Sequence, residues 1–151
     1  MKWIDVLLAF IAAAAGTFGF AVLLRTPKRS WLPSSLLGGC GYTLYVLLVF
    51  VGLSDPLSML ISAACASFTA YRLARRMRII STVFLSMSVI PLVPGLGLYR
   101  CMSFIGSGMA DSAFSTGTDA MAVILMIVLG VSVGSFANRL MAGVNKHEPN
   151  R

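Results

Sequence analysis

Charged residues are scarce in this sequence. Only 11% of the 151 residues are Asp, Glu, Lys or Arg, while 58% are hydrophobic, and soluble domains carry about 25% charged residues. The hydrophobic residues also occur in long runs, with a mean hydropathy of +0.87. Runs of this length suit helices that cross a bilayer. The composition therefore excludes an ordinary soluble domain and predicts an all-α integral membrane protein.

Residues that bind metals or form disulfides are equally few. Three cysteines, Cys40, Cys65 and Cys101, are far apart in the sequence, and the one histidine, His147, lies in the polar C-terminal tail. Zinc sites require closely spaced Cys and His ligands, and a disulfide framework usually has an even number of cysteines. We therefore expect no metal site and no cofactor, and we interpret the cysteines as small packing residues.

Catalytic groupings are also missing. The sequence has no histidine beside a candidate serine nucleophile, no paired carboxylates and no glycine-rich phosphate loop. We therefore do not expect an enzyme. The formal charge of +7 comes from short basic segments between hydrophobic runs, without interleaved aromatic residues. This pattern favours contact with the headgroups of the lipid bilayer and predicts no nucleic-acid partner.

Carboxylates are absent from the interior of the hydrophobic runs. The aspartates, Asp5, Asp55, Asp111 and Asp119, all fall at the ends of these runs or between them. Proton-coupled carriers usually hold a titratable group within the bilayer. Either another chain supplies it, or Asp111 or Asp119 folds back into the pathway, or transport is uncoupled. We favour the first explanation, because a small chain without an internal acid looks like part of a transporter.

Five hydrophobic segments approach the length needed to cross about 30 Å of hydrocarbon. We expect one transmembrane domain over residues 1–151, a bundle of about five helices, with spans at about 4–24, 35–53, 57–73, 79–99 and 120–140. A cleaved signal peptide is disfavoured for the first segment, because its hydrophobic run continues to Leu24. Between the last two spans, residues 101–118 are rich in Gly, Ser and Thr. They predict either a short interfacial helix, with Asp111 or Thr118 capping the next span, or a solvated loop.

The basic residues indicate the orientation. All Lys and Arg residues except Lys2 and Arg100 lie after the first span, after the third span or in the C-terminal part. Short connections rich in Lys and Arg remain in the cytoplasm. The pattern predicts a multi-pass protein of the cell (plasma or inner) membrane, with its N-terminus outside and its C-terminus in the cytoplasm.

Several glycines are spaced as in membrane helices that pack closely. Small residues let two helix backbones approach each other in lipid. The predicted packing positions are Gly16, Gly19, Gly38, Gly41, Gly130 and Gly134. Such positions serve either packing within one bundle or contact with a partner chain, and a homo-oligomer is left open.

The fourth span contains an unusual stretch, Pro91–Gly97, with two prolines and two glycines. Pro91 and Pro94 have no N–H and deprive the carbonyls of Met87 and Ile90 of their helical donors. Unpaired carbonyls are tolerated at membrane depth only against protein or a water-filled cavity. We therefore predict that the fourth helix is broken at this Pro-x-x-Pro-Gly segment and that solute passes here. A simple packing kink is the alternative.

The stretch "IPLVPGLGLYRCM", Ile90–Met102, resembles the signature of the threonine/serine exporter family. The number of spans and the basic connection before the fourth span fit the small membrane domain that forms the C-terminal half of fused exporters. The resemblance implies proton-driven export of small amino acids such as threonine and serine. It also implies a second, larger multi-spanning subunit with a hydrophilic domain. Two alternatives are a subunit for export of dicarboxylates such as succinate, and a non-transporting scaffold or assembly subunit.

The resemblance also assigns roles to residues of the motif. Pro91, Pro94 and Gly95 would shape the break, with Tyr99 and Arg100 at its outer end. We hypothesise that Arg100 and freed backbone groups attract the carboxylate of the solute; anchoring of Arg100 among lipid headgroups is the alternative. The complete set of predicted pathway residues is Pro91, Pro94, Gly95, Gly97, Tyr99, Arg100 and Asp111.

Overall fold

The computed structural model describes residues 3–144, and this part of the chain contains helices and no strands. Lys2 and His147, which entered the predictions above, lie outside the described residues, as do the basic residues of the C-terminal part Lys146 and Arg151. The elements are α1 (Trp3–Leu23), η1 (Lys28–Ser30), α2 (Trp31–Phe50), α3 (Asp55–Met77), α4 (Ser81–Val89), η2 (Ile90–Leu92), α5 (Gly95–Gly106) and α6 (Ala110–Val144).

Within the described part, four helical segments are long and apolar enough to cross a membrane. They are Ile4–Leu23, Lys28–Phe50, Asp55–Met77 and Ala110–Met141. The bent pair Ser81–Leu92 and Gly95–Gly106 provides a fifth candidate when it is taken as one span. The all-α membrane fold expected from the hydrophobic runs is thus confirmed.

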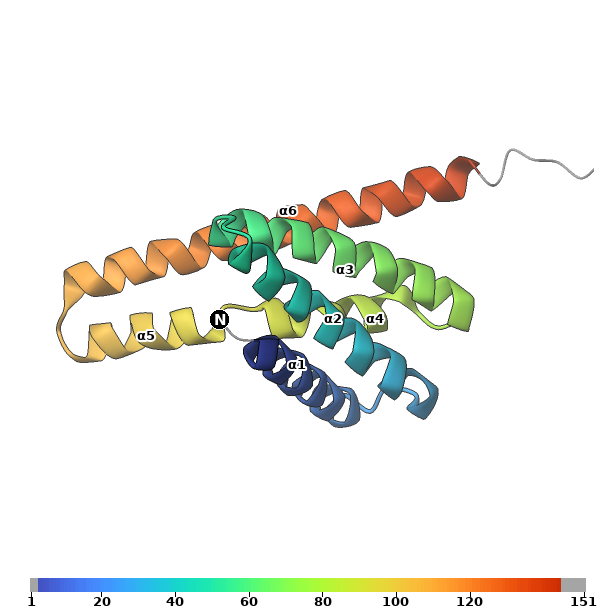
Figure 1. Cartoon of the computed structure of the whole chain (residues 1–151), viewed down its shortest axis with the longest axis horizontal. Helices are drawn as coiled ribbons and strands as arrows, with labels where there is room; N and C mark the ends of the chain where they lie inside the picture. The colour runs from blue at the N-terminus through green and yellow to red at the C-terminus, as the bar shows by residue number, and fades with distance from the viewer. Residues whose placement is uncertain (1–2, 145–151) are drawn as a thin grey trace, which may run out of the picture.

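The helices form a bundle with a projecting hairpin (Figure 1). Helices α1 to α4 lie together with the C-terminal part of α6, whereas α5 and the N-terminal part of α6 extend beyond the bundle. In the hairpin, Cys101 Sγ of α5 lies 3.3 Å from the carbonyl oxygen of Ala113 in α6. Helices α3 and α6 run parallel, since Gly130 lies against Leu60 and Gly134 against Ala64.

Helices α3 and α6 touch along their backbones. A Cβ added at Gly130 would meet the Leu60 carbonyl and would lie 2.9 Å from Ala63 Cβ. One added at Gly134 would collide with Ser67 Oγ and the Ala64 carbonyl. Only glycine allows this approach, which joins the last long helix to the centre of the bundle.

The glycine cluster of α2 places this helix between α1 and α3. Gly38 packs so tightly on Thr17 that an added Cβ would overlap its side chain. A Cβ at Gly41 would lie 3.4 Å from Ala66 Cβ of α3, and Ser62 Oγ donates a 2.5 Å hydrogen bond to the Gly41 carbonyl. Small residues and one polar contact thus hold α2 against both neighbours.

The predicted packing glycines of α1 differ from those of α2 and α6. A Cβ added at Gly16 or at Gly19 would meet nothing within 4 Å. Neither position is therefore needed for close helix approach within the described chain. Packing of Gly19 on a second chain stays a prediction.

The segment between the last two predicted spans is helical. Helix α5 continues to Gly106, and α6 already begins at Ala110, after a turn in which Gly108 has φ 72°. Thr118 lies inside α6, so its prediction as a helix cap is wrong. Its hydroxyl donates to the Phe114 carbonyl at 3.0 Å and to that of Ser115 at 2.8 Å. Because hydroxyls can bond back to their own helix, a Ser- and Thr-rich segment can remain helical.

The broken helix and the cavity beside it

The fourth hydrophobic segment is interrupted at its prolines. Helix α4 ends at Val89, the η2 turn follows, and Val93 is extended with ψ 128° before α5 begins at Gly95. The parts before and after the interruption are bent by 52°. Leu92 of the turn is fully buried and packs with Met59 and Ile127. The interruption is therefore anchored in the core of the bundle.

The backbone carbonyls at the break differ in their partners. Pro91 has no N–H, so the carbonyl of Met87 loses the donor that a continuous helix would supply. Sequence reasoning expected the same of the Ile90 carbonyl, but it accepts the N–H of Val93 at 3.3 Å. A 3-10 turn replaces that helical bond, so the Ile90 carbonyl loses its helical donor as predicted but is not left unpaired.

A cavity of about 310 Å³ lies beside the break, between α1, α2 and η2. Its α1 wall contains Ala12, Gly16 and Phe20, which recur one helical turn apart and so share a face. The complete lining is Ala12, Ala13, Gly16, Thr17, Phe20, Tyr42, Ile90 and Pro91. None of these side chains carries a charge, so the cavity suits a neutral group.

Two hydroxyl groups belong to this mostly apolar lining. Thr17 is buried, and its hydroxyl donates to the Ala13 carbonyl at 2.7 Å, which leaves it only the capacity to accept. The hydroxyl of half-buried Tyr42 has no hydrogen-bond partner among the described residues. Tyr42 can therefore both donate to and accept from a bound molecule.

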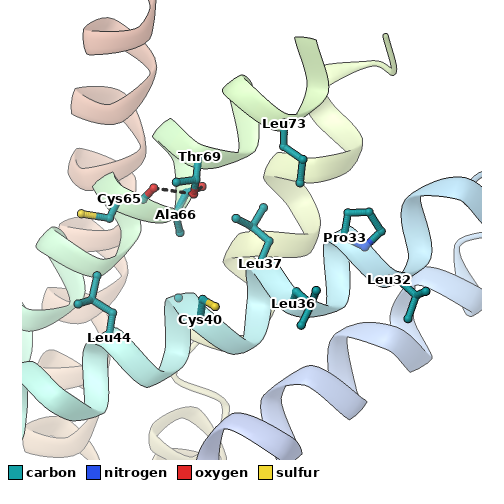
Figure 2. Close-up of a pocket in the computed structure, with 11 residues that line it drawn as sticks. Leu32, Pro33, Leu36, Leu37, Cys40, Leu44, Cys65, Ala66, Thr69 and Leu73 are labelled. Atoms are coloured by element: carbon teal, nitrogen blue, oxygen red, sulfur yellow. Dashed lines mark hydrogen bonds between the residues drawn. The ribbon is translucent and has the colours of Figure 1, made fainter. Parts of the chain in front are cut away.

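A larger groove of about 540 Å³ separates α2 and α3 (Figure 2). Cys40 and Cys65 line its two facing walls, and the other lining residues include five leucines, Leu32, Leu36, Leu37, Leu44 and Leu73. The hydroxyl of Thr69 donates a hydrogen bond to the Cys65 carbonyl of its own helix at 2.8 Å. The groove includes no residue of the break. The smaller cavity, which combines the break with two hydroxyl-bearing side chains, is therefore the candidate solute site.

The structure brings only part of the predicted pathway set together. Pro91 lines the cavity, and Pro94 and Gly95 form the junction between η2 and α5. Gly97 instead faces α6, where an added Cβ would lie 3.6 Å from Ala120 Cβ.

The remaining members of the set lie on the projecting hairpin. The Tyr99 side chain is 71% exposed on α5, and Arg100 beside it is also exposed. Asp111 is exposed in the first turn of α6, near the tip of the hairpin (Figure 1). None of the three lines the cavity, so contact of Arg100 with solute stays a prediction.

Of the residues that line the cavity, only Pro91 belongs to the predicted pathway set; the lining residues of α1 and α2, among them Gly16, Thr17 and Tyr42, are absent from it. Their helices are remote in sequence from Pro91, and no motif joins them. One local signal was present: Ala12, Gly16 and Phe20 put two small residues and an aromatic on one face of α1. Within residues 3–144, no group of three or more His, Cys, Asp or Glu side chains could hold a metal ion.

Comparison with known families adds an independent finding. The family described as "Threonine/Serine exporter, ThrE" matches residues 5–137. The matched range includes the broken helix and every residue that lines the cavity. No curated protein and no solved structure matches the chain.

Proposed function

Since the chain belongs to the threonine/serine exporter family, we propose that it is the membrane subunit of a two-component secondary exporter. The exported solutes are small amino acids such as threonine and serine, and the proton gradient drives their efflux. The observation that carries the proposal is the cavity at the break: Ile90 and Pro91 line it together with Tyr42, whose hydroxyl has no hydrogen-bond partner among the described residues. Broken helices of this kind form substrate sites in many transporters.

The wall of the cavity favours a second subunit. Ala12 and Gly16 line it and are exposed, so α1, α2 and η2 leave this side uncovered. No carboxylate lines the cavity, although proton coupling requires a titratable group in or near the pathway. A larger multi-spanning partner with a hydrophilic domain would supply both the missing wall and the acid.

The alternatives make different demands on the site. A dicarboxylate such as succinate carries two negative charges, and burying them without cationic partners costs several kcal/mol per ion. The cavity offers no cation, so its lining suits the uncharged side chain of a small amino acid better than a carboxylate group. A non-transporting scaffold would have no need for the available hydroxyl of Tyr42.

When the exporter is reconstituted in cells, we expect export to require both chains. The chain is expressed alone, with its multi-spanning partner, or not at all, in cells fed a threonine-containing dipeptide. Intracellular threonine should accumulate when either chain is missing. When both chains are present, external threonine should rise instead. Unchanged threonine and serine under every combination would contradict the proposal and direct the test to organic acids.

We propose that the N-terminus is outside and that Ser81–Gly106 crosses the membrane. In the described chain, every Lys and Arg except Arg100 lies at the end of the bundle where α1, α3 and α6 finish (Figure 1). Ser81–Gly106 leads from this end to the opposite one, where α6 begins. Basic ends remain cytoplasmic.

The orientation can be checked with single cysteines in a background without Cys40, Cys65 and Cys101. In intact cells, a membrane-impermeant maleimide should label Ser54→Cys, in the turn before α3. It should label Ile80→Cys, before α4, only after the cells are opened. Both parent side chains are exposed. The reverse pattern would refute the proposed orientation.

A further inference from the structure

Gly16 occupies a special position on the cavity wall. It lines the cavity, and an added Cβ would meet nothing within 4 Å. A side chain at position 16 would therefore meet open space at the edge of the cavity and would displace no other helix. Gly38 is the opposite case, because its added Cβ would overlap Thr17. The volume of the cavity thus depends directly on the size of residue 16.

The chemistry of the lining matches the side chain of a small hydroxy amino acid. Ala12 and Phe20 offer apolar surface, and the hydroxyls of Tyr42 and Thr17 offer hydrogen bonds. A solute hydroxyl that donates to Thr17 could accept a second hydrogen bond from the hydroxyl of Tyr42. The charged amino and carboxylate groups of the solute find no ionic partner in this lining. They would remain outside it, towards the uncovered side.

We infer that this cavity receives the side chain of the exported amino acid and that Gly16 sets the largest side chain accepted. The inference rests on the proposed exporter function and adds the specificity-determining residue. Ala12, one turn before Gly16 on the same face, keeps the neighbouring wall small as well. Phe20, one turn after it, fills the wall towards the end of α1.

A series of substitutions tests the inference in cells that express both subunits. Gly16→Ala should reduce export of threonine more than that of serine and change their export ratio about ten-fold, because one methyl group in a packed site is worth 10-fold or more. Gly16→Leu should abolish export of both. Gly19→Ala is the matched control: its added Cβ is equally unhindered, but position 19 does not line the cavity. Its ratio should equal that of the wild type.

A binding measurement separates this inference from the proposed function. In membranes that contain both chains, Gly16→Cys, with the three native cysteines replaced, is labelled by a small maleimide. Threonine at ten times its Kd should slow the labelling about ten-fold, since the free fraction falls by that factor. It should leave Gly19→Cys unaffected, and succinate should protect neither.

The outcomes are distinct. Protection of position 16 in cells that show no export supports the cavity assignment and contradicts the exporter function. Wild-type export ratios in the Gly16 variants, or labelling at position 16 that threonine does not slow, would overturn the inference even where the two chains export threonine.

Discussion

Gly134→Leu is expected to prevent assembly of the bundle. The first added carbon would collide with Ser67 Oγ and the Ala64 carbonyl, and the Phe68 amide nitrogen lies 3.2 Å from it. Two of these three obstacles are backbone atoms of α3, which cannot rotate away as a flexible side chain does. Overpacking of a core typically costs about 1–3 kcal/mol. Collision with the helix backbone should put this variant at or beyond the upper end of that range.

The measurement is the amount and melting temperature of the detergent-solubilised protein, followed by size-exclusion chromatography. Gly134→Leu should give little monodisperse protein, whereas Gly19→Leu in α1 should resemble the wild type, because its Cβ meets nothing within 4 Å. Wild-type melting of Gly134→Leu would mean that α3 and α6 are not in backbone contact.

The same contrast shows how far small-residue patterns can be read. The sequence presents Gly16, Gly19, Gly130 and Gly134 alike, as glycines on hydrophobic helices. In the structure, the pair on α6 meets α3, while Gly16 faces a cavity. A small residue in a membrane helix indicates either a close neighbour or open space, but it does not indicate which helix that neighbour belongs to. That depends on which helices pack together, which is a property of the whole bundle.

The hairpin of α5 and α6 illustrates a second limit. Residues 101–118 resemble a loop by composition, because Ser, Thr and Gly prefer turns in water. The hydroxyls of Thr116 and Thr118 instead donate to carbonyls of their own helix at 2.8 to 3.0 Å. The hydrophobic runs were long enough to predict membrane helices, but they could not predict that α6 begins ten residues before its apolar part.

The break itself was predictable because its cause is local. A proline removes its own N–H whatever surrounds it, so the sequence alone locates the interruption near Pro91. The cavity required tertiary structure, since Gly16 and Tyr42 reach the break from two other helices. Burial of Leu92 against Met59 and Ile127 then holds the interruption in place. The break is therefore a fixed element of the bundle core.

Replacement of both Pro91 and Pro94 by alanine should abolish export without loss of stability. A proline inside a helix costs roughly 3 kcal/mol, so alanine restores the donors for Met87 and Ile90 and favours one continuous helix from α4 into α5. Continuation of the helix would turn Ile90 and residue 91 away from the cavity. We expect at least a ten-fold loss of threonine export, together with a melting temperature near that of the wild type, because the gain in helix offsets the loss of the buried position of Leu92.

The matched control is Pro56→Ala. Pro56 stands at the beginning of α3, where a proline has no helical bond to remove, so this variant should export normally. The combination of undiminished stability and lost export would distinguish the two explanations of the break. If the break serves only packing, straightening it should lower the melting temperature. Export should then fall only in proportion to the loss of folded protein. Full export by the double variant would show that solute transport does not depend on the break. The solute site would then have to lie elsewhere in the complex.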